Sequence, residues 1–185
     1  MAELVLITGG ARSGKSRYAE VQARSLPGPW LYVATCAADP AFGGAPDPEM
    51  RERIARHRRR RGKEWRTVEE PRDLASVLAA ASAPVVLIDC LALWVSNLLA
   101  VEDLDEDGVA RRARDLLAVI RDRPGAVFAV TSEVGCGIVP ANVLARRFRD
   151  CLGRCNQEFG AAANRVVMVV CGQAMQLKEG EDVST

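Results

Sequence analysis

The segment from Gly9 to Ser16 constrains the fold of this chain more than any other part of the sequence. It reads Gly-Gly-Ala-Arg-Ser-Gly-Lys-Ser, which satisfies the spacing Gly-x-x-x-x-Gly-Lys-Ser. An apolar run at residues 3–8 precedes it directly, and a pattern typical of a helix follows from about Lys15 to Ser25. We therefore predict a buried strand that leads through a glycine-rich loop into a helix.

Such a loop binds phosphate because its glycines let the backbone approach without a Cβ in the way. Its N–H groups and the N-terminus of the following helix then face the anion together. Lys15 can reach the β- and γ-phosphates, and the Ser16 hydroxyl can bind Mg²⁺. We predict that the whole loop contacts the phosphates of a nucleoside triphosphate, through Gly9, Gly10, Ala11, Arg12, Ser13, Gly14, Lys15 and Ser16.

Asp89 is the candidate acidic partner of this loop. It ends the apolar run Val85-Val86-Leu87-Ile88, which is the clearest buried strand of the sequence. An acid at the end of a neighbouring strand commonly holds Mg²⁺ in P-loop proteins, so we predict Ser16 and Asp89 as metal ligands. The alternative is that Asp89 only caps a helix that starts just after it.

The remaining pattern predicts an α/β fold in which strands and helices alternate. A parallel sheet needs crossover connections, and helices supply them, so we expect a mostly parallel sheet with helices on both faces. With no internal repeat and no linker, we expect one P-loop nucleotide-binding domain of the RecA-like type over residues 1–185. Further strands are expected at 30–35, 126–131 and 166–171, and helices at 48–62, 72–82, 91–100, 109–123 and 141–164.

Composition excludes several other classes. The 25 basic and 24 acidic residues nearly balance, so charge provides no general attraction to nucleic acid or membrane. No apolar run reaches the ~18 residues of a membrane span, and no signal peptide is visible, so we expect a cytoplasmic protein. Six cysteines without a Cys-x-x-Cys pair, beside a single histidine, argue against zinc and favour buried free thiols.

That single histidine, His57, lies in a run of arginines that continues through Arg58, Arg59, Arg60 and Arg61. The simplest interpretation is a solvated basic helix. A nucleic-acid patch is a second interpretation, although no aromatic residues interleave with the charges. A third is chemical. Nearby cations disfavour imidazolium, so the ring stays neutral near pH 7 and can attack phosphorus, while the same cations attract a triphosphate.

Several segments together resemble one enzyme family. They are the loop with Arg17, Tyr32–Thr35, Arg53–Arg58, Trp65–Glu69, Leu87–Leu91, Asn97–Leu99, Ser132–Pro140, and Arg147–Asp150 with Gly153 and Asn156-Gln157. In this order they are similar to the bifunctional adenosylcobinamide kinase / adenosylcobinamide-phosphate guanylyltransferase family (CobU/CobP). The resemblance runs from residue 4 to about residue 178.

The resemblance implies an enzyme of late cobalamin biosynthesis that uses ATP or GTP with Mg²⁺. It implies phosphorylation of adenosylcobinamide, then transfer of GMP from GTP through a guanylylated histidine, which by position is His57. It also implies a homotrimer, and the balanced charge leads us to expect no nucleic-acid partner. Further nucleotide contacts are implied at Ala34, Thr35, Cys36, Arg58, Arg59, Arg60, Arg61, Glu69 and Asp89. Two rival hypotheses are a P-loop kinase without a covalent step and a RecA-like module that binds nucleic acid.

Overall fold

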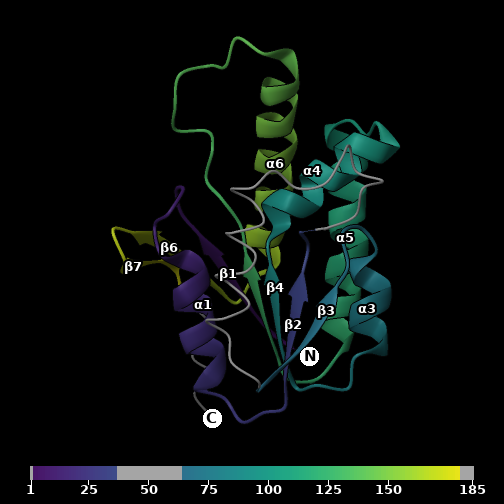
Figure 1. The fold of residues 1–185 in the computed structure, drawn as a ribbon, viewed down its shortest axis with the longest axis vertical. Coiled ribbons are helices and arrows are strands. Elements are labelled where there is room, and N and C mark those ends of the chain that lie inside the picture. Colours follow the sequence, from purple (N-terminus) through teal and green to yellow (C-terminus); the bar gives the residue numbers. More distant parts are fainter. Residues whose placement is uncertain (1, 37–63, 180–185) are drawn as a thin grey trace.

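The protein is described by a computed structural model that covers residues 2–36 and 64–179. Seven strands form one sheet in the order β3-β2-β4-β5-β1-β6-β7 (Figure 1). All neighbouring pairs are parallel except β6 with β7, which is antiparallel. The strands are β1 (Glu3–Thr8), β2 (Trp30–Ala34), β3 (Trp65–Glu69), β4 (Val85–Asp89), β5 (Ala126–Val130), β6 (Arg165–Val170) and β7 (Gln173–Lys178).

Helices cover both faces of the sheet (Figure 1). Helix α1 packs on one face, and the other described helices pack on the opposite face. Successive strand side chains point to opposite faces, so Leu4 and Leu6 join one core layer while Val5 and Ile7 join the other. The helices are α1 (Lys15–Arg24), α3 (Leu74–Ala80), α4 (Leu91–Glu102), α5 (Glu106–Asp122) and α6 (Val143–Ala162).

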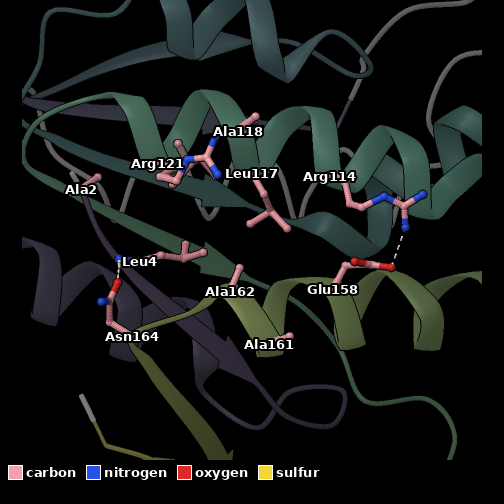
Figure 2. A pocket seen from close by; sticks show the side chains of 11 residues that line it. Ala2, Leu4, Arg114, Leu117, Ala118, Arg121, Glu158, Ala161, Ala162 and Asn164 are labelled. Atoms are coloured by element: carbon pink, nitrogen blue, oxygen red, sulfur yellow. Dashed lines mark hydrogen bonds and ion pairs between the residues drawn. The ribbon is translucent and has the colours of Figure 1, made fainter. Parts of the chain in front are cut away.

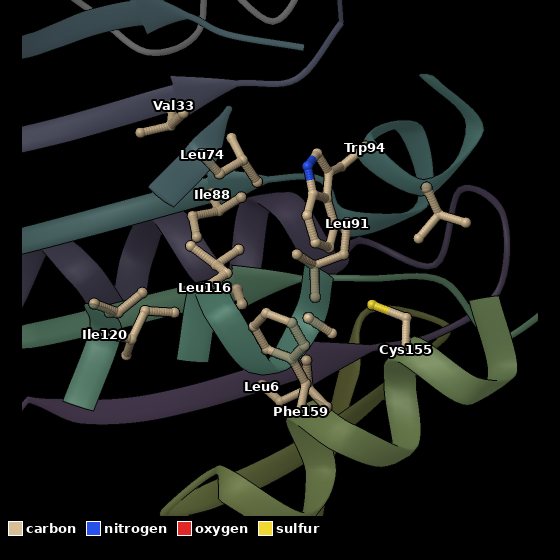
Figure 3. Packing of buried hydrophobic residues seen from close by; sticks show 14 of the residues in the cluster. Leu6, Val33, Leu74, Ile88, Leu91, Trp94, Leu116, Ile120, Cys155 and Phe159 are labelled. Carbon is tan, nitrogen blue, oxygen red and sulfur yellow. The ribbon is translucent and has the colours of Figure 1, made fainter. Parts of the chain in front are cut away.

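The larger core layer lies under α3–α6 (Figure 3). Ile88 from the sheet, Trp94 from α4 and Phe159 from α6 are all at most 2% exposed. Each fully buried side chain of this size contributes about 1.5–3 kcal/mol through removal of apolar surface from water. This packing holds the strand ends in fixed positions, and the candidate site is built at those ends.

Polar caps set where three of these helices begin. Asp73 accepts a hydrogen bond from the Ser76 amide at 3.1 Å. The Ser76 side chain, and after it the Ser76 amide, lower the pKa of the Asp73 carboxyl by hydrogen bonding. Asp105 accepts a hydrogen bond from the Gly108 amide at 2.7 Å and so caps the start of α5. Asn142 caps α6 through the Ala145 amide at 3.0 Å.

The predicted α/β architecture with a mostly parallel sheet is confirmed, and the elements expected within the described residues lie within a few residues of their predicted ends. Strands β3 and β7 were not predicted. Only Trp65 of β3 is buried, and all of β7 is exposed, so neither has an apolar pattern. The helix expected at 48–62 lies outside the described residues. Within those residues, no helix is long and apolar enough to cross a membrane.

The expectation of six buried thiols was only partly right. Cys151 and Cys155 are buried, whereas Cys136 and Cys171 are exposed and Cys36 and Cys90 lie between these extremes. Burial raises the pKa of the Cys155 thiol to about 12. Burial, with a smaller effect of the Asp89 carboxylate, also raises the pKa of Cys90 to about 12.

We expect iodoacetamide at about pH 8 to label Cys136 and Cys171 in the folded protein and to spare Cys90 and Cys155, because only an accessible thiolate reacts. Peptide mass spectrometry after timed quenching measures this. Unfolding in guanidinium should make all six thiols reactive. Labelling of Cys155 in the folded state as fast as Cys136 would contradict the packing described above.

Candidate functional site

The loop predicted to bind phosphate follows β1 at the carboxyl edge of the sheet. Its backbone has positive φ at Gly9 (151°), Arg12 (56°) and Gly14 (99°). Gly14 is the N-cap of α1, so the loop leads directly into the helix N-terminus. Ligands of open α/β sheets bind in the crevice outside the carboxyl ends of the strands, which is where this loop lies.

The loop is held from two sides. On one side, the Glu133 amide beyond β5 donates to the Gly9 carbonyl at 3.2 Å. On the other, the Gly172 amide in the β6–β7 turn donates to the Ser13 carbonyl at 2.8 Å. Gly9 also lies so close to the Val169 carbonyl that a Cβ would collide with it. These contacts fix the loop backbone before any ligand arrives.

One hydrogen bond joins the loop to the end of β4, and two further bonds hold the groups on either side of it. The Ser16 hydroxyl donates to Asp89 Oδ1 at 3.2 Å, across 73 residues of sequence. Tyr32 from β2 donates its hydroxyl to Asp89 Oδ2 at 2.5 Å. Lys15 is only 9% exposed, and its ammonium donates to the Gly10 carbonyl at 3.0 Å. The structure thus brings together Ser16 and Asp89, as the sequence predicted, with Lys15 next to Ser16 at the start of α1.

Two further predicted residues share a row with Asp89. Ala34, the last residue of β2, is in register with Asp89 on one side and with Glu69 of β3 on the other. All three therefore stand at the same carboxyl edge, with Glu69 exposed. The row extends the candidate site from the loop of residues 9–16, called the phosphate loop below, toward the β3 side of the sheet.

Thr35 has a structural part in this edge. It is fully buried, its hydroxyl donates to the Cys90 carbonyl at 2.8 Å, and it accepts from the Cys90 amide at 2.7 Å. Its own amide donates to the Asp89 carbonyl at 3.2 Å. Asn97 of α4 donates to the Thr35 carbonyl at 2.8 Å. Thr35 therefore joins β2, β4 and α4 just before Cys36, and its predicted contact with nucleotide stays a prediction.

The predicted nucleophile His57 and the cations Arg58–Arg61 lie outside the described residues. Their placement relative to the loop is a prediction only. Within the described residues, no group of three or more histidine, cysteine or acidic side chains is arranged to hold a metal ion. A hydroxyl and a carboxylate oxygen that already touch, at Ser16 and Asp89, suit Mg²⁺, which takes few protein ligands and completes its shell with phosphate and water.

The sequence did not assign roles to some residues that shape the site. Tyr32, Asn97 and Asn156 appear within the family-like segments, but only the fold shows their hydrogen bonds. Apart from its being a glycine, nothing in the sequence indicated that Gly172 supports the loop. Its φ of 77° and that of Cys171, 52°, form the tight β6–β7 turn that supports the loop.

A separate pocket of about 650 Å³ lies between α5 and α6, near the amino end of β1 (Figure 2). Leu4 and Leu117 line its apolar part, and Arg114 pairs with Glu158 at its rim at 2.9 Å. None of the predicted site residues lines it. The phosphate loop follows the opposite end of β1, so this pocket is not part of the candidate site.

The family model described as cobinamide kinase / cobinamide phosphate guanyltransferase matches residues 5–177. The chain belongs to this family. Members of the family with curated names are similar over nearly their whole length. A bifunctional adenosylcobalamin biosynthesis protein CobP from Pseudomonas aeruginosa is 42% identical over 175 residues, covering 94% of this chain and 96% of the relative.

A bifunctional adenosylcobalamin biosynthesis protein CobU from Escherichia coli is 40% identical over 188 residues, covering 95% of this chain and 99% of the relative. Among solved structures, the flagellar accessory protein FlaH from Methanocaldococcus jannaschii matches with a TM-score of 0.52. The match covers 96% of this chain and 79% of FlaH at 13% identity. That likeness shows the fold alone.

The tight contact at Gly9 generates a paired test. Gly9→Ala should lower the free energy of unfolding by at least about 2 kcal/mol, because the new Cβ meets the Val169 carbonyl and the positive φ is strained. Gly10→Ala is the control, since nothing lies within 4 Å of its Cβ position, and it should cost less than about 1 kcal/mol. Denaturant unfolding without nucleotide measures both. Equal losses would show that the loop backbone is not held as described.

Proposed function

We propose that this chain carries out two successive transfers in the biosynthesis of adenosylcobalamin. In the first, the aminopropanol hydroxyl of adenosylcobinamide receives a phosphoryl group from ATP or GTP. In the second, GMP moves from GTP to the new phosphate, which releases pyrophosphate and gives adenosylcobinamide-GDP. The observation that carries the proposal is the contact of Ser16 with Asp89 in a chain of this family, because a hydroxyl and a carboxylate placed together beside the loop are suited to hold Mg²⁺ and phosphate.

The kinase step uses the loop as a rigid cradle. Phosphoryl transfer needs mainly positioning and stabilisation of charge. The loop's backbone N–H groups would supply both without reorganisation, because the Gly9 and Ser13 carbonyls are held by the Glu133 and Gly172 amides. The Lys15 ammonium donates a hydrogen bond to the Gly10 carbonyl. When nucleotide binds, it would donate to the β- and γ-phosphate oxygens instead. Gly14 at the start of α1 adds the positive end of the helix dipole.

Ser16 and Asp89 are the residues that would hold Mg²⁺. When bound, Mg²⁺ neutralises charge on the phosphate oxygens. Tyr32 keeps the Asp89 carboxylate in place by donating to Oδ2, so that Oδ1 is directed to the Ser16 hydroxyl. The tyrosine therefore fixes the carboxylate orientation that a metal at Ser16 requires.

In the guanylyltransferase step, His57 would act as nucleophile. An imidazole nitrogen attacks the α-phosphorus of GTP, a P–N bond forms, and the P–O bond to pyrophosphate breaks. A phosphate oxygen of adenosylcobinamide phosphate then attacks the same phosphorus and releases the imidazole. Arg58, Arg59, Arg60 and Arg61 would stabilise the charge that develops on the phosphate oxygens. Ala34, Cys36 and Glu69, at the same sheet edge, would contact the nucleotide.

Two rival functions make different predictions. A P-loop kinase without a covalent step would transfer the γ-phosphoryl group and never carry nucleotide itself. A nucleic-acid module would bind single-stranded DNA with an affinity that falls steeply as salt rises. The net charge of +1 and the family match both favour the enzyme with two activities.

The decisive experiment is incubation with α-labelled GTP and Mg²⁺, followed by denaturation. We expect acid-labile label on the wild-type protein and none on His57→Ala, because only the phosphoramidate survives denaturation. The same variant should still phosphorylate adenosylcobinamide, since that step does not use the imidazole.

Lys15→Met is the matched variant for the phosphate grip, and it should lower both activities. Product identity is read by mass spectrometry of the corrinoid. Equal labelling of wild type and His57→Ala would refute the covalent step. Phosphorylation without any protein label in the wild type would support the simpler kinase.

We also propose that the chain assembles as a homotrimer, as the family resemblance implies. Light scattering coupled to size-exclusion chromatography should then give three times the chain mass of 20.0 kDa. A mass equal to one chain at micromolar concentration would contradict the trimer. It would not decide on the two transfers, which the labelling experiment tests separately. The cytoplasmic location stays a prediction.

A further inference from the structure

A hydrogen-bonded connection runs from helix α6 to the phosphate loop. The side-chain amide of Asn156 makes two hydrogen bonds with the segment that follows β5, one through its oxygen and one through its nitrogen. Its oxygen accepts from the Thr131 hydroxyl at 2.6 Å, and its nitrogen donates to the Ser132 carbonyl at 3.0 Å. The next residue, Glu133, donates its amide to Gly9, the first residue of the loop.

The location of this connection matters because the chain leaves the sheet there. Thr131 is fully buried and its amide still donates to the Ile7 carbonyl at 2.8 Å, in line with the strand pairing. Beyond Glu133 the segment becomes exposed, with Ile138 97% and Val139 62% exposed, before α6 begins. Figure 1 shows this segment extending past the carboxyl edge of the sheet. Asn156 therefore restrains the last residues that connect β5 to the loop.

An amide is needed at this position for a chemical reason. The Thr131 hydroxyl requires an acceptor and the Ser132 carbonyl requires a donor, and one asparagine provides both. A leucine of similar size would leave a buried hydroxyl and a carbonyl without partners. The segment would then be free to shift, and the Glu133 amide would shift with it.

We propose that Asn156 is a positioning residue of the nucleotide site, which acts through Ser132 and Glu133 on the Gly9 carbonyl. It touches no reacting atom itself. Through this connection Asn156 holds the Gly9 end of the loop in place, whereas the Gly172 amide holds the Ser13 end. This inference rests on the proposed nucleotide site.

Asn156→Leu tests the proposal, with Cys155→Ala as the matched control. Cys155 is the neighbouring residue on α6 and is fully buried in the core, but it makes none of these hydrogen bonds. Hydrogen exchange without nucleotide, followed by NMR, reports on the Glu133 amide directly. In Asn156→Leu, exchange at Glu133 should rise about tenfold while the Thr131 amide, held by Ile7, stays protected.

Nucleotide binding and kinetics give the functional measurement. The dissociation constant for a non-hydrolysable GTP analogue, and the KM for nucleotide in the kinase reaction, should both rise about tenfold in Asn156→Leu. Cys155→Ala should lower the melting temperature but leave Glu133 exchange and nucleotide affinity unchanged. Thr131→Val, which removes one of the two bonds and keeps the shape, should give a smaller change in the same direction.

The proposal is overturned if Asn156→Leu loses melting temperature as Cys155→Ala does while Glu133 exchange and nucleotide affinity remain at wild-type values. Should Asn156→Leu fail to fold, Thr131→Val decides by the same two measurements. If the wild-type protein binds no nucleotide, the proposed function fails, whereas Glu133 exchange still decides whether Asn156 positions the loop.

Discussion

The hydrogen bond between Ser16 and Asp89 is the contact on which the rest of the site depends. It joins the first turn of α1 to the end of β4, although β5 lies between β1 and β4 in the sheet. A bond across that gap forms only if the three strands end at matching levels, and the parallel register of β1 with β5 and of β5 with β4 provides this. The fold therefore places a hydroxyl and a carboxylate together, and oxygen atoms of this kind suit Mg²⁺.

The same edge is stabilised by hydrogen bonds that end on neighbouring strands. Tyr32 holds the second oxygen of Asp89, and Thr35 joins the next residue, Cys90, through two hydrogen bonds. Asn97 connects this junction to the segment after β3 by donating to the Pro71 carbonyl at 3.0 Å. A displacement of β2 would therefore move the Asp89 carboxylate. Tyr32, Thr35 and Asn97, which take no chemical part in the proposed reactions, thus determine the position of Asp89 relative to Ser16.

The phosphate loop, the Asp89 strand and the α/β architecture could be predicted from the sequence because each has a local pattern. Buried strands such as β4 and β5 are continuously apolar, and the glycine spacing of the loop is a local requirement of phosphate binding. Strands β3 and β7 could not be predicted, because they lie at the edges and pair through backbone groups that leave no side-chain pattern. The contacts of Asn156 and Gly172 join segments distant in the sequence, so only the fold reveals them.

In the proposed chemistry, one phosphate-binding loop takes part in two reactions, which occur at different phosphorus atoms of the nucleotide. A cradle that fixes the β- and γ-phosphates determines where the α-phosphorus lies, since the three are covalently connected. The hydroxyl of the corrinoid must then approach from the γ side, whereas an imidazole must approach the α-phosphorus. Because the loop backbone is held on both sides, by Glu133 and by Gly172, it cannot readily shift a nucleotide between these positions. The second reaction therefore requires the nucleophile to be brought to the nucleotide, which explains why a residue outside the loop, His57, is the proposed carrier of GMP.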